Sequence, residues 1–197
     1  LPDALPIFDC SQQDTAPTLD IILSLSSHEP FEVPAIRRYE NAYLNSIAYT
    51  DSCIGALADS LRQTAAWDNT LLVFVADHGF PYPEGLQNHE PKRYAIPIVW
   101  AGGAVKAPRK ITQLCNQTDL AATLLAQLQL PHDQYRWSRD VLSASYRYPF
   151  AVHNYNNGFS LTDSTGFIAY DLNSHRLVTN ESSQATRLER MGKAILQ

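Results

Sequence analysis

The sequence predicts an α/β protein: a partial α/β/α sandwich with a mostly parallel sheet, followed by a small antiparallel β-hairpin subdomain. Three observations support this class. Unbroken apolar segments of strand length occur at 19–27, 70–76 and 96–101, and such strands are typical of a sheet covered on both faces. Segments with helical periodicity alternate with these strands, as they do in parallel sheets. From residue 148 onward, short strands separated by turn residues replace this alternation.

The composition is that of an ordinary globular chain. Of its 197 residues, 45% are hydrophobic and 18% are charged, which argues against a disordered chain. The net charge of −5 argues against nucleic-acid binding, because domains that bind nucleic acid are usually basic. No segment approaches the roughly 20 apolar residues of a membrane helix, and no signal-peptide pattern opens the chain. Since the chain starts at Leu1 rather than at Met, we expect it to be part of a longer protein.

The first expected strand, 19–27, ends at the loop His28-Glu29-Pro30-Phe31, where proline favours extended backbone. Apolar side chains then recur at steps of three and four residues between Ile36 and Leu61. This spacing predicts an amphipathic helix over about 36–65. A turn at 67–69 leads into the expected strand 70–76.

The strand 70–76 ends at Asp77-His78-Gly79. Open α/β sheets usually place their ligands at the carboxyl ends of strands, and a carboxylate beside an imidazole suits a divalent metal. The same residues also fit a simple turn, in which Asp77 accepts hydrogen bonds from backbone amides and Gly79 supplies a positive φ. The local pattern leaves both interpretations open.

The segment after Gly79 is a long loop rich in proline, glycine and polar residues, and loops of this kind are often functional. The short strand 96–101 follows and ends at Gly102-Gly103. Thr118 or Asp119 is expected to cap a helix over 120–129, which Pro131 would close.

Residues 148–197 are expected to form the antiparallel subdomain, and 1–147 the larger α/β part. Asn156-Asn157-Gly158 lies between two apolar segments, which predicts a tight β-hairpin. A second hairpin and a helix from about residue 183 complete this subdomain. The expected strands are 149–155, 159–161, 166–170 and 176–179.

Four elements in consistent order resemble the carboxyl-terminal half of a sulfatase-like enzyme of the alkaline phosphatase superfamily. These elements are 25–31, 68–79, 96–98 and 118–125. The His-x-Pro-Phe element that begins at His28 is similar to that of the lipoteichoic-acid synthase and phosphoglycerol transferase branch. The resemblance extends from about residue 19 to about residue 130, and residues from Tyr148 onward resemble the family's terminal hairpins more loosely.

The resemblance implies that Asp77 and His78 bind the catalytic divalent metal. The metal is Mn²⁺ in many relatives, with Zn²⁺, Mg²⁺ and Ca²⁺ as further candidates. A metal held in this way can offset the charge of a phosphate or sulfate oxygen and lower the pKa of a nucleophile.

His28 would correspond to the family's substrate-site histidine, which contacts the phosphoryl group or the leaving oxygen. The other interpretation of His28 is a loop histidine bonded to backbone. His89 and Arg93 lie in the long loop and could contact an anionic substrate. They could equally be a solvated histidine and a surface charge, and His153 has no context that would favour a functional role.

The family's nucleophile and at least one more acidic metal ligand are not recognisable in this chain. Cys10 lacks the Cys-x-Pro-x-Arg context of a sulfatase, Cys53 lies in the expected helix, and Cys115 matches no zinc or CxxC pattern. Because two ligands do not fill a catalytic divalent site, we expect the chain alone to bind metal weakly and to be inactive.

The expected function of the intact protein is metal-dependent transfer or hydrolysis of phosphate esters, such as phosphoglycerol, or of sulfate esters. Its substrate would be an anionic envelope polymer or lipid-linked head group at the extracytoplasmic face of a bacterial membrane, with membrane helices outside this chain. Two alternatives remain open. One is a sulfuric-ester hydrolase, and the other is a non-catalytic remnant that binds an anionic glycan or a protein partner.

Overall fold

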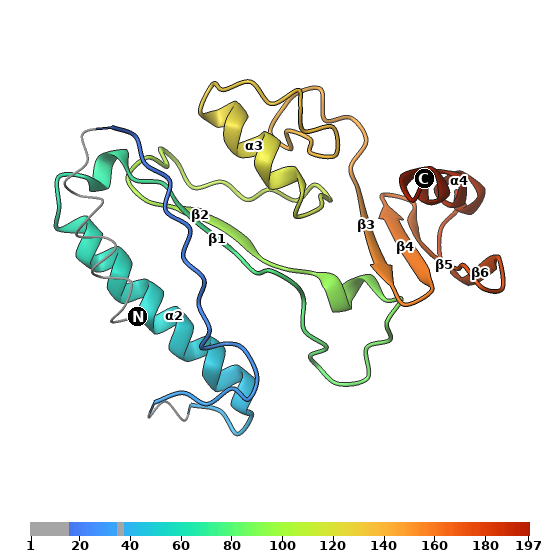
Figure 1. Cartoon of the computed structure of the whole chain (residues 1–197), viewed down its shortest axis with the longest axis horizontal. Coiled ribbons are helices and arrows are strands. Elements are labelled where there is room, and N and C mark those ends of the chain that lie inside the picture. The colour runs from blue at the N-terminus through green and yellow to red at the C-terminus, as the bar shows by residue number, and fades with distance from the viewer. Residues whose placement is uncertain (1–15, 35–37) are drawn as a thin grey trace. The chain divides into compact units, whose positions relative to one another are not determined.

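The computed structural model describes residues 16–34 and 38–197 of an α/β chain (Figure 1). The chain divides into two compact units. The first lies within residues 1–74 and 99–108, and the second comprises 75–98 and 109–197. In the part of the chain that is described, no helix is both long enough and apolar enough to cross a bilayer.

The main helix of the first unit is α2, Ala42–Arg62. It begins at Ala42 because the side chain of Asn41 accepts a hydrogen bond from the Leu44 amide at 3.1 Å, as an N-cap residue does. The helix predicted over about 36–65 is therefore confirmed in its position but begins later. Residues 35–37 of that prediction lie outside the described residues.

The segment 19–27 is not a strand, so the prediction of a buried strand there is wrong. Its apolar side chains lie in solvent, and those of Leu19, Ile21 and Leu23 are 78%, 81% and 83% exposed. Among the residues the structure describes, none pairs with this segment as a neighbouring strand. An apolar run becomes a strand only when a partner satisfies its backbone groups and covers its side chains.

Strands β1, Leu72–Val75, and β2, Ile98–Ala101, pair with each other as a two-stranded sheet. Both are shorter than the predicted strands 70–76 and 96–101. They are also only partly buried, and Val75 and Val99 are 39% and 51% exposed. The expectation of a strand buried on both faces is wrong because two strands alone leave much of their surface uncovered.

The turn after β2 depends on close backbone contact within the first unit. A Cβ atom on Gly102 would lie 2.2 Å from the Thr70 carbonyl oxygen, and one on Gly103 would lie 2.4 Å from that of Trp67. Gly102 also has a φ of +106°, which disfavours other residues. The two glycines therefore end β2 where the sequence predicted.

The second unit contains α3, Asp119–Gln127, close to the predicted 120–129. The Thr118 side chain does not cap this helix. Instead the Asp119 carboxylate accepts a hydrogen bond from the Asn116 amide at 2.9 Å while pairing with Arg139. Asp119 is 1% exposed, so this charge is buried and depends on its partners.

The carboxyl-terminal part is an antiparallel sheet covered by the last helix (Figure 1). Its strands pair in chain order, β3-β4-β5-β6, which confirms the predicted antiparallel hairpins. The side chains that form its core are Phe159, Leu161, Ile168, Tyr170 and Leu188. The elements are β3 Phe150–Tyr155, β4 Gly158–Asp163, β5 Gly166–Asp171, β6 Arg176–Asn180 and α4 Ala185–Ile195.

Candidate metal-binding site

Asp77 and His78 follow the end of β1 and present both side chains to solvent. The imidazole of His78 is 71% exposed and the carboxylate of Asp77 is 85% exposed. Asp77 Oδ1 accepts a hydrogen bond from the His78 amide at 2.9 Å. This bond turns the carboxylate toward the imidazole, so that Asp77 Oδ2 lies 3.7 Å from His78 Nε2.

The protonation pattern of the His78 ring follows from its backbone contact. Nδ1 lies 2.9 Å from the Gly79 carbonyl oxygen, and because a carbonyl only accepts, Nδ1 must carry the proton of this bond. In the neutral ring the lone pair is then on Nε2. A hydrogen bond from one ring nitrogen to backbone is the usual way in which proteins orient a metal-binding histidine.

The geometry of this pair fits a shared divalent ion. At the tetrahedral angle of Zn²⁺, metal–ligand distances of about 2.1 Å place two donor atoms about 3.4 Å apart, and at the octahedral angle of Mn²⁺ about 3.0 Å apart, compared with the observed 3.7 Å. Within 16–34 and 38–197, no three His, Cys, Asp or Glu side chains come together as a possible metal site. A complete site would therefore need further ligands, and the assignment of Asp77 and His78 stays a prediction.

Gly79 is required for close packing rather than for a positive φ. A Cβ atom at this position would lie 2.3 Å from the Arg93 carbonyl oxygen and 2.9 Å from Tyr94 Cα. Gly79 is not among the glycines with positive φ, so that part of the turn interpretation is wrong. The glycine allows the turn after Asp77 to lie directly against the short 3₁₀ helix η2, Pro91–Tyr94.

This contact brings the loop with His89 and Arg93 to the Asp77 turn. The loop is also attached to the antiparallel sheet, because Ser160 Oγ donates to the His89 carbonyl oxygen at 2.8 Å. The Tyr94 ring stacks on that of His153 with centroids 3.8 Å apart. The substrate contacts of His89 and Arg93 stay predictions.

His153, which the sequence left without a role, is the most perturbed histidine of the unit. Burial, followed by the nearby charge of His89, lowers the pKa of His153 from 6.5 to about 4. Its Nε2 is buried and, within the described chain, has no hydrogen-bond partner. His153 is therefore neutral at pH 7 and supports the loop by stacking.

His28 lies in the first unit, whereas Asp77, His78, His89 and Arg93 lie in the second. It is exposed, and its Nδ1 donates to the Glu29 carbonyl oxygen at 2.8 Å. This is the backbone contact that the loop interpretation predicted. It leaves Nε2 available to a ligand, so the substrate role of His28 also stays a prediction.

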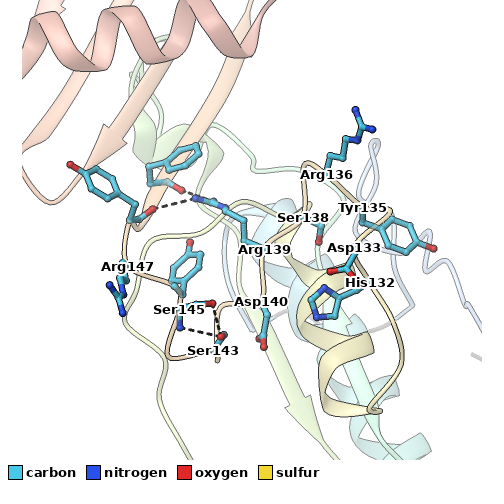
Figure 2. A pocket seen from close by; sticks show the side chains of 13 residues that line it. His132, Asp133, Tyr135, Arg136, Ser138, Arg139, Asp140, Ser143, Ser145 and Arg147 are labelled. Atoms are coloured by element: carbon cyan, nitrogen blue, oxygen red, sulfur yellow. Dashed lines mark hydrogen bonds between the residues drawn. The ribbon is translucent and has the colours of Figure 1, made fainter.

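A separate hollow of about 480 Å³ is lined by residues of the segment 132–150 (Figure 2). Arg139 lines this hollow. Its guanidinium donates hydrogen bonds to the carbonyl oxygens of Tyr148 and Phe150 (Figure 2). The same guanidinium pairs with Asp119 at 2.5 Å. The charge of Arg139 is thus used within the fold.

The comparisons with known proteins agree on one family. A family model described as Sulfatase matches residues 3–130. Choline-sulfatase of Rhizobium meliloti is 33% identical over 93 residues, which are 45% of this chain and 18% of that protein. Arylsulfatase K of Canis lupus familiaris is 28% identical over 98 residues, which are 48% of this chain and 18% of that protein.

Two further matches come from the wider superfamily. A multifunctional alkaline phosphatase superfamily protein, PehA of Trinickia caryophylli, is 31% identical over 68 residues, 32% of this chain and 13% of that protein. The crystal structure of an alkaline phosphatase superfamily protein from Vibrio parahaemolyticus superposes with a TM-score of 0.79 at 20% identity. That superposition covers 99% of this chain and 52% of the other, so the chain spans about half of that structure and a smaller share of the curated relatives.

Proposed function

Because the chain belongs to the sulfatase family, we propose that it contributes Asp77 and His78 to the metal centre of an enzyme that hydrolyses sulfate esters. The observation that carries this proposal is the orientation of the pair. His78 Nδ1 is committed to backbone and its Nε2 lies 3.7 Å from Asp77 Oδ2. A divalent ion bound here would use both donor atoms at once.

Our first candidate for the ion is Mn²⁺, with Ca²⁺, Mg²⁺ and Zn²⁺ as alternatives, because a carboxylate with an imidazole suits each of them to some degree. When bound, such an ion would offset negative charge on the ester oxygens and lower the pKa of a nucleophile. The chain's own residues would hold and orient it. The Asp77 turn is kept in place by the contact of Gly79 with the backbone of Arg93 and Tyr94.

Sulfate esters are the favoured substrate class because choline-sulfatase and arylsulfatase K are both named for that activity. Phosphoglycerol transfer at the extracytoplasmic face of a membrane is the second candidate. It is supported by the His-x-Pro-Phe element at His28. In either case the substrate is anionic, and His28, His89 and Arg93 are the proposed contacts.

The test uses a protein that joins this chain to the other half of a sulfatase domain. We expect it to contain a divalent metal by elemental analysis, and Asp77→Asn to remove both that metal and the activity. Asp68→Asn, which changes another exposed aspartate, should alter neither. Hydrolysis of p-nitrophenyl sulfate rather than bis(p-nitrophenyl) phosphate would support a sulfatase, and the reverse preference would support the transferase branch.

Unchanged metal content in Asp77→Asn would refute the assignment of Asp77. Metal-free, inactive protein that still binds sulfated glycans would instead favour the non-catalytic alternative. The 197-residue chain by itself should hydrolyse neither compound, because Asp77 and His78 are only two of the ligands that a catalytic site needs.

A further inference from the structure

The Gln117 side chain joins the start of α3 to the turn that carries Asp77. Its Nε2 donates to the Ala76 carbonyl oxygen at 2.6 Å and to the Asp77 carbonyl oxygen at 3.0 Å. Both acceptors are backbone carbonyls, which cannot donate. The amide must therefore present its NH₂ group, with one N–H for each acceptor.

These two carbonyls belong to the peptide groups on either side of Asp77 Cα. Because each peptide group is planar, anchoring both of them restricts the φ and ψ of Asp77 and hence the direction of its side chain. The second peptide group also carries the His78 amide, which donates to Asp77 Oδ1 at 2.9 Å. One side-chain amide thus restrains the backbone from which both proposed metal ligands project.

Gln117 is itself held between two fixed neighbours. The Asn116 side chain donates to the Val152 carbonyl oxygen at 2.7 Å and accepts from the Val152 amide at 3.0 Å, so it bonds to β3 as a strand would. On the other side, the buried Asp119 carboxylate accepts from the backbone and side chain of Arg139. These contacts of Asn116 and Asp119 therefore fix the backbone to which the flexible Gln117 side chain is attached.

We propose that Gln117 is a positioning residue for the Asp77–His78 pair, an inference that rests on the proposed metal site. It contacts neither metal nor substrate and acts by fixing the two peptide groups around Asp77. Gln117 is exposed, so replacing its side chain leaves the core intact. Partners that orient metal ligands typically change metal affinity about 10- to 100-fold when they are removed.

The experiment compares Gln117→Met and Gln117→Glu with Gln113→Met in the 197-residue chain, labelled with ¹⁵N. Methionine keeps the length of the side chain without donors, and glutamate replaces the donors by acceptors. Gln113 is an exposed glutamine of the same segment and serves as the matched control. Two quantities are measured: amide hydrogen exchange without metal, and the Mn²⁺ dissociation constant from paramagnetic broadening of the His78 and Gly79 amide signals.

We expect both Gln117 variants to raise amide exchange at His78 about tenfold, because the His78 amide donates to Asp77 Oδ1 from a peptide group that Gln117 no longer holds. We also expect them to weaken Mn²⁺ binding about tenfold, whereas Gln113→Met changes neither quantity. Unchanged exchange in both variants would overturn the proposal. Faster exchange with unchanged Mn²⁺ affinity would overturn it as well, because Gln117 would then be merely structural.

The failure of the metal site itself gives a different result. If Asp77→Ala leaves the Mn²⁺ broadening of the His78 and Gly79 signals intact, the proposed metal ligands are wrong. The metal-free exchange rates then decide alone whether Gln117 fixes this turn.

Discussion

The two sheets of this chain differ sharply in how they are stabilised. In the antiparallel sheet, Phe159, Leu161 and Ile168 are 0% exposed and pack with Leu188 of α4. In the sheet of β1 and β2, every residue is at least partly exposed. The strand that leads to Asp77 is therefore the less well covered of the two, and the better-packed sheet holds the loop around the candidate site.

This difference in burial predicts that the antiparallel sheet has a higher local stability than the sheet of β1 and β2. Loops and functional turns are commonly drawn from parts of low local stability, whereas a buried core resists opening. Here the Ser160 bond to the His89 carbonyl and the stacking of His153 on Tyr94 attach the loop that contains His89 to the antiparallel sheet. Three predictions test this comparison, in order of decreasing effect.

Phe159→Ala should cause the largest loss. Removing a fully buried phenylalanine costs about 3–5 kcal/mol of unfolding free energy, through lost burial and the cavity left behind. Val73→Ala on the half-buried β1 should cost less than half as much. Urea unfolding followed by far-ultraviolet circular dichroism measures both, and equal losses would show that the two sheets do not differ as proposed.

Asp119→Asn should cause the second-largest loss of unfolding free energy, about 3 kcal/mol. It leaves the Arg139 guanidinium without the carboxylate that neutralises it. Arg139 also donates to the Phe150 carbonyl and lies 3.8 Å from the centroid of that ring. The loss should therefore appear in the melting of β3 together with α3. Hydrogen exchange that rises in α3 alone would contradict this coupling. Asp133→Asn, an exposed aspartate of the following segment, is the control.

The smallest expected effect is a loss of unfolding free energy at acidic pH. The pKa of His153 is lowered from 6.5 to about 4, by burial first and by His89 second. Its contribution to stability is therefore complete above pH 6.5 and is lost as the pH falls toward 4. Allowing for partial exposure, the loss should be on the order of 1–2 kcal/mol.

His153→Phe keeps an aromatic ring on Tyr94 but cannot take up a proton. The variant should therefore lose the decline in melting temperature between pH 6.5 and 4, while His175→Phe, at an exposed turn, should keep it. An identical decline in the wild type and in His153→Phe would exclude His153 as its source.

Much of the fold could be predicted from local patterns. The turn Asn156-Asn157-Gly158 predicted the β3–β4 hairpin, and Asn157 adopts a φ of 63°, a left-handed conformation that asparagine tolerates in turns. The helix α2 follows from three- and four-residue apolar spacing. The prediction for 19–27 failed because apolar character alone does not supply a neighbouring strand.

The sequence by itself determined the helices, the hairpins and the adjacency of Asp77 and His78, because each depends on residues a few positions apart. Only the tertiary structure decided what surrounds that pair. Gln117 reaches the Ala76 carbonyl across 41 positions, and Gly79 is required by the backbone of Arg93. Such contacts depend on how distant segments pack, and no local periodicity or turn preference encodes them.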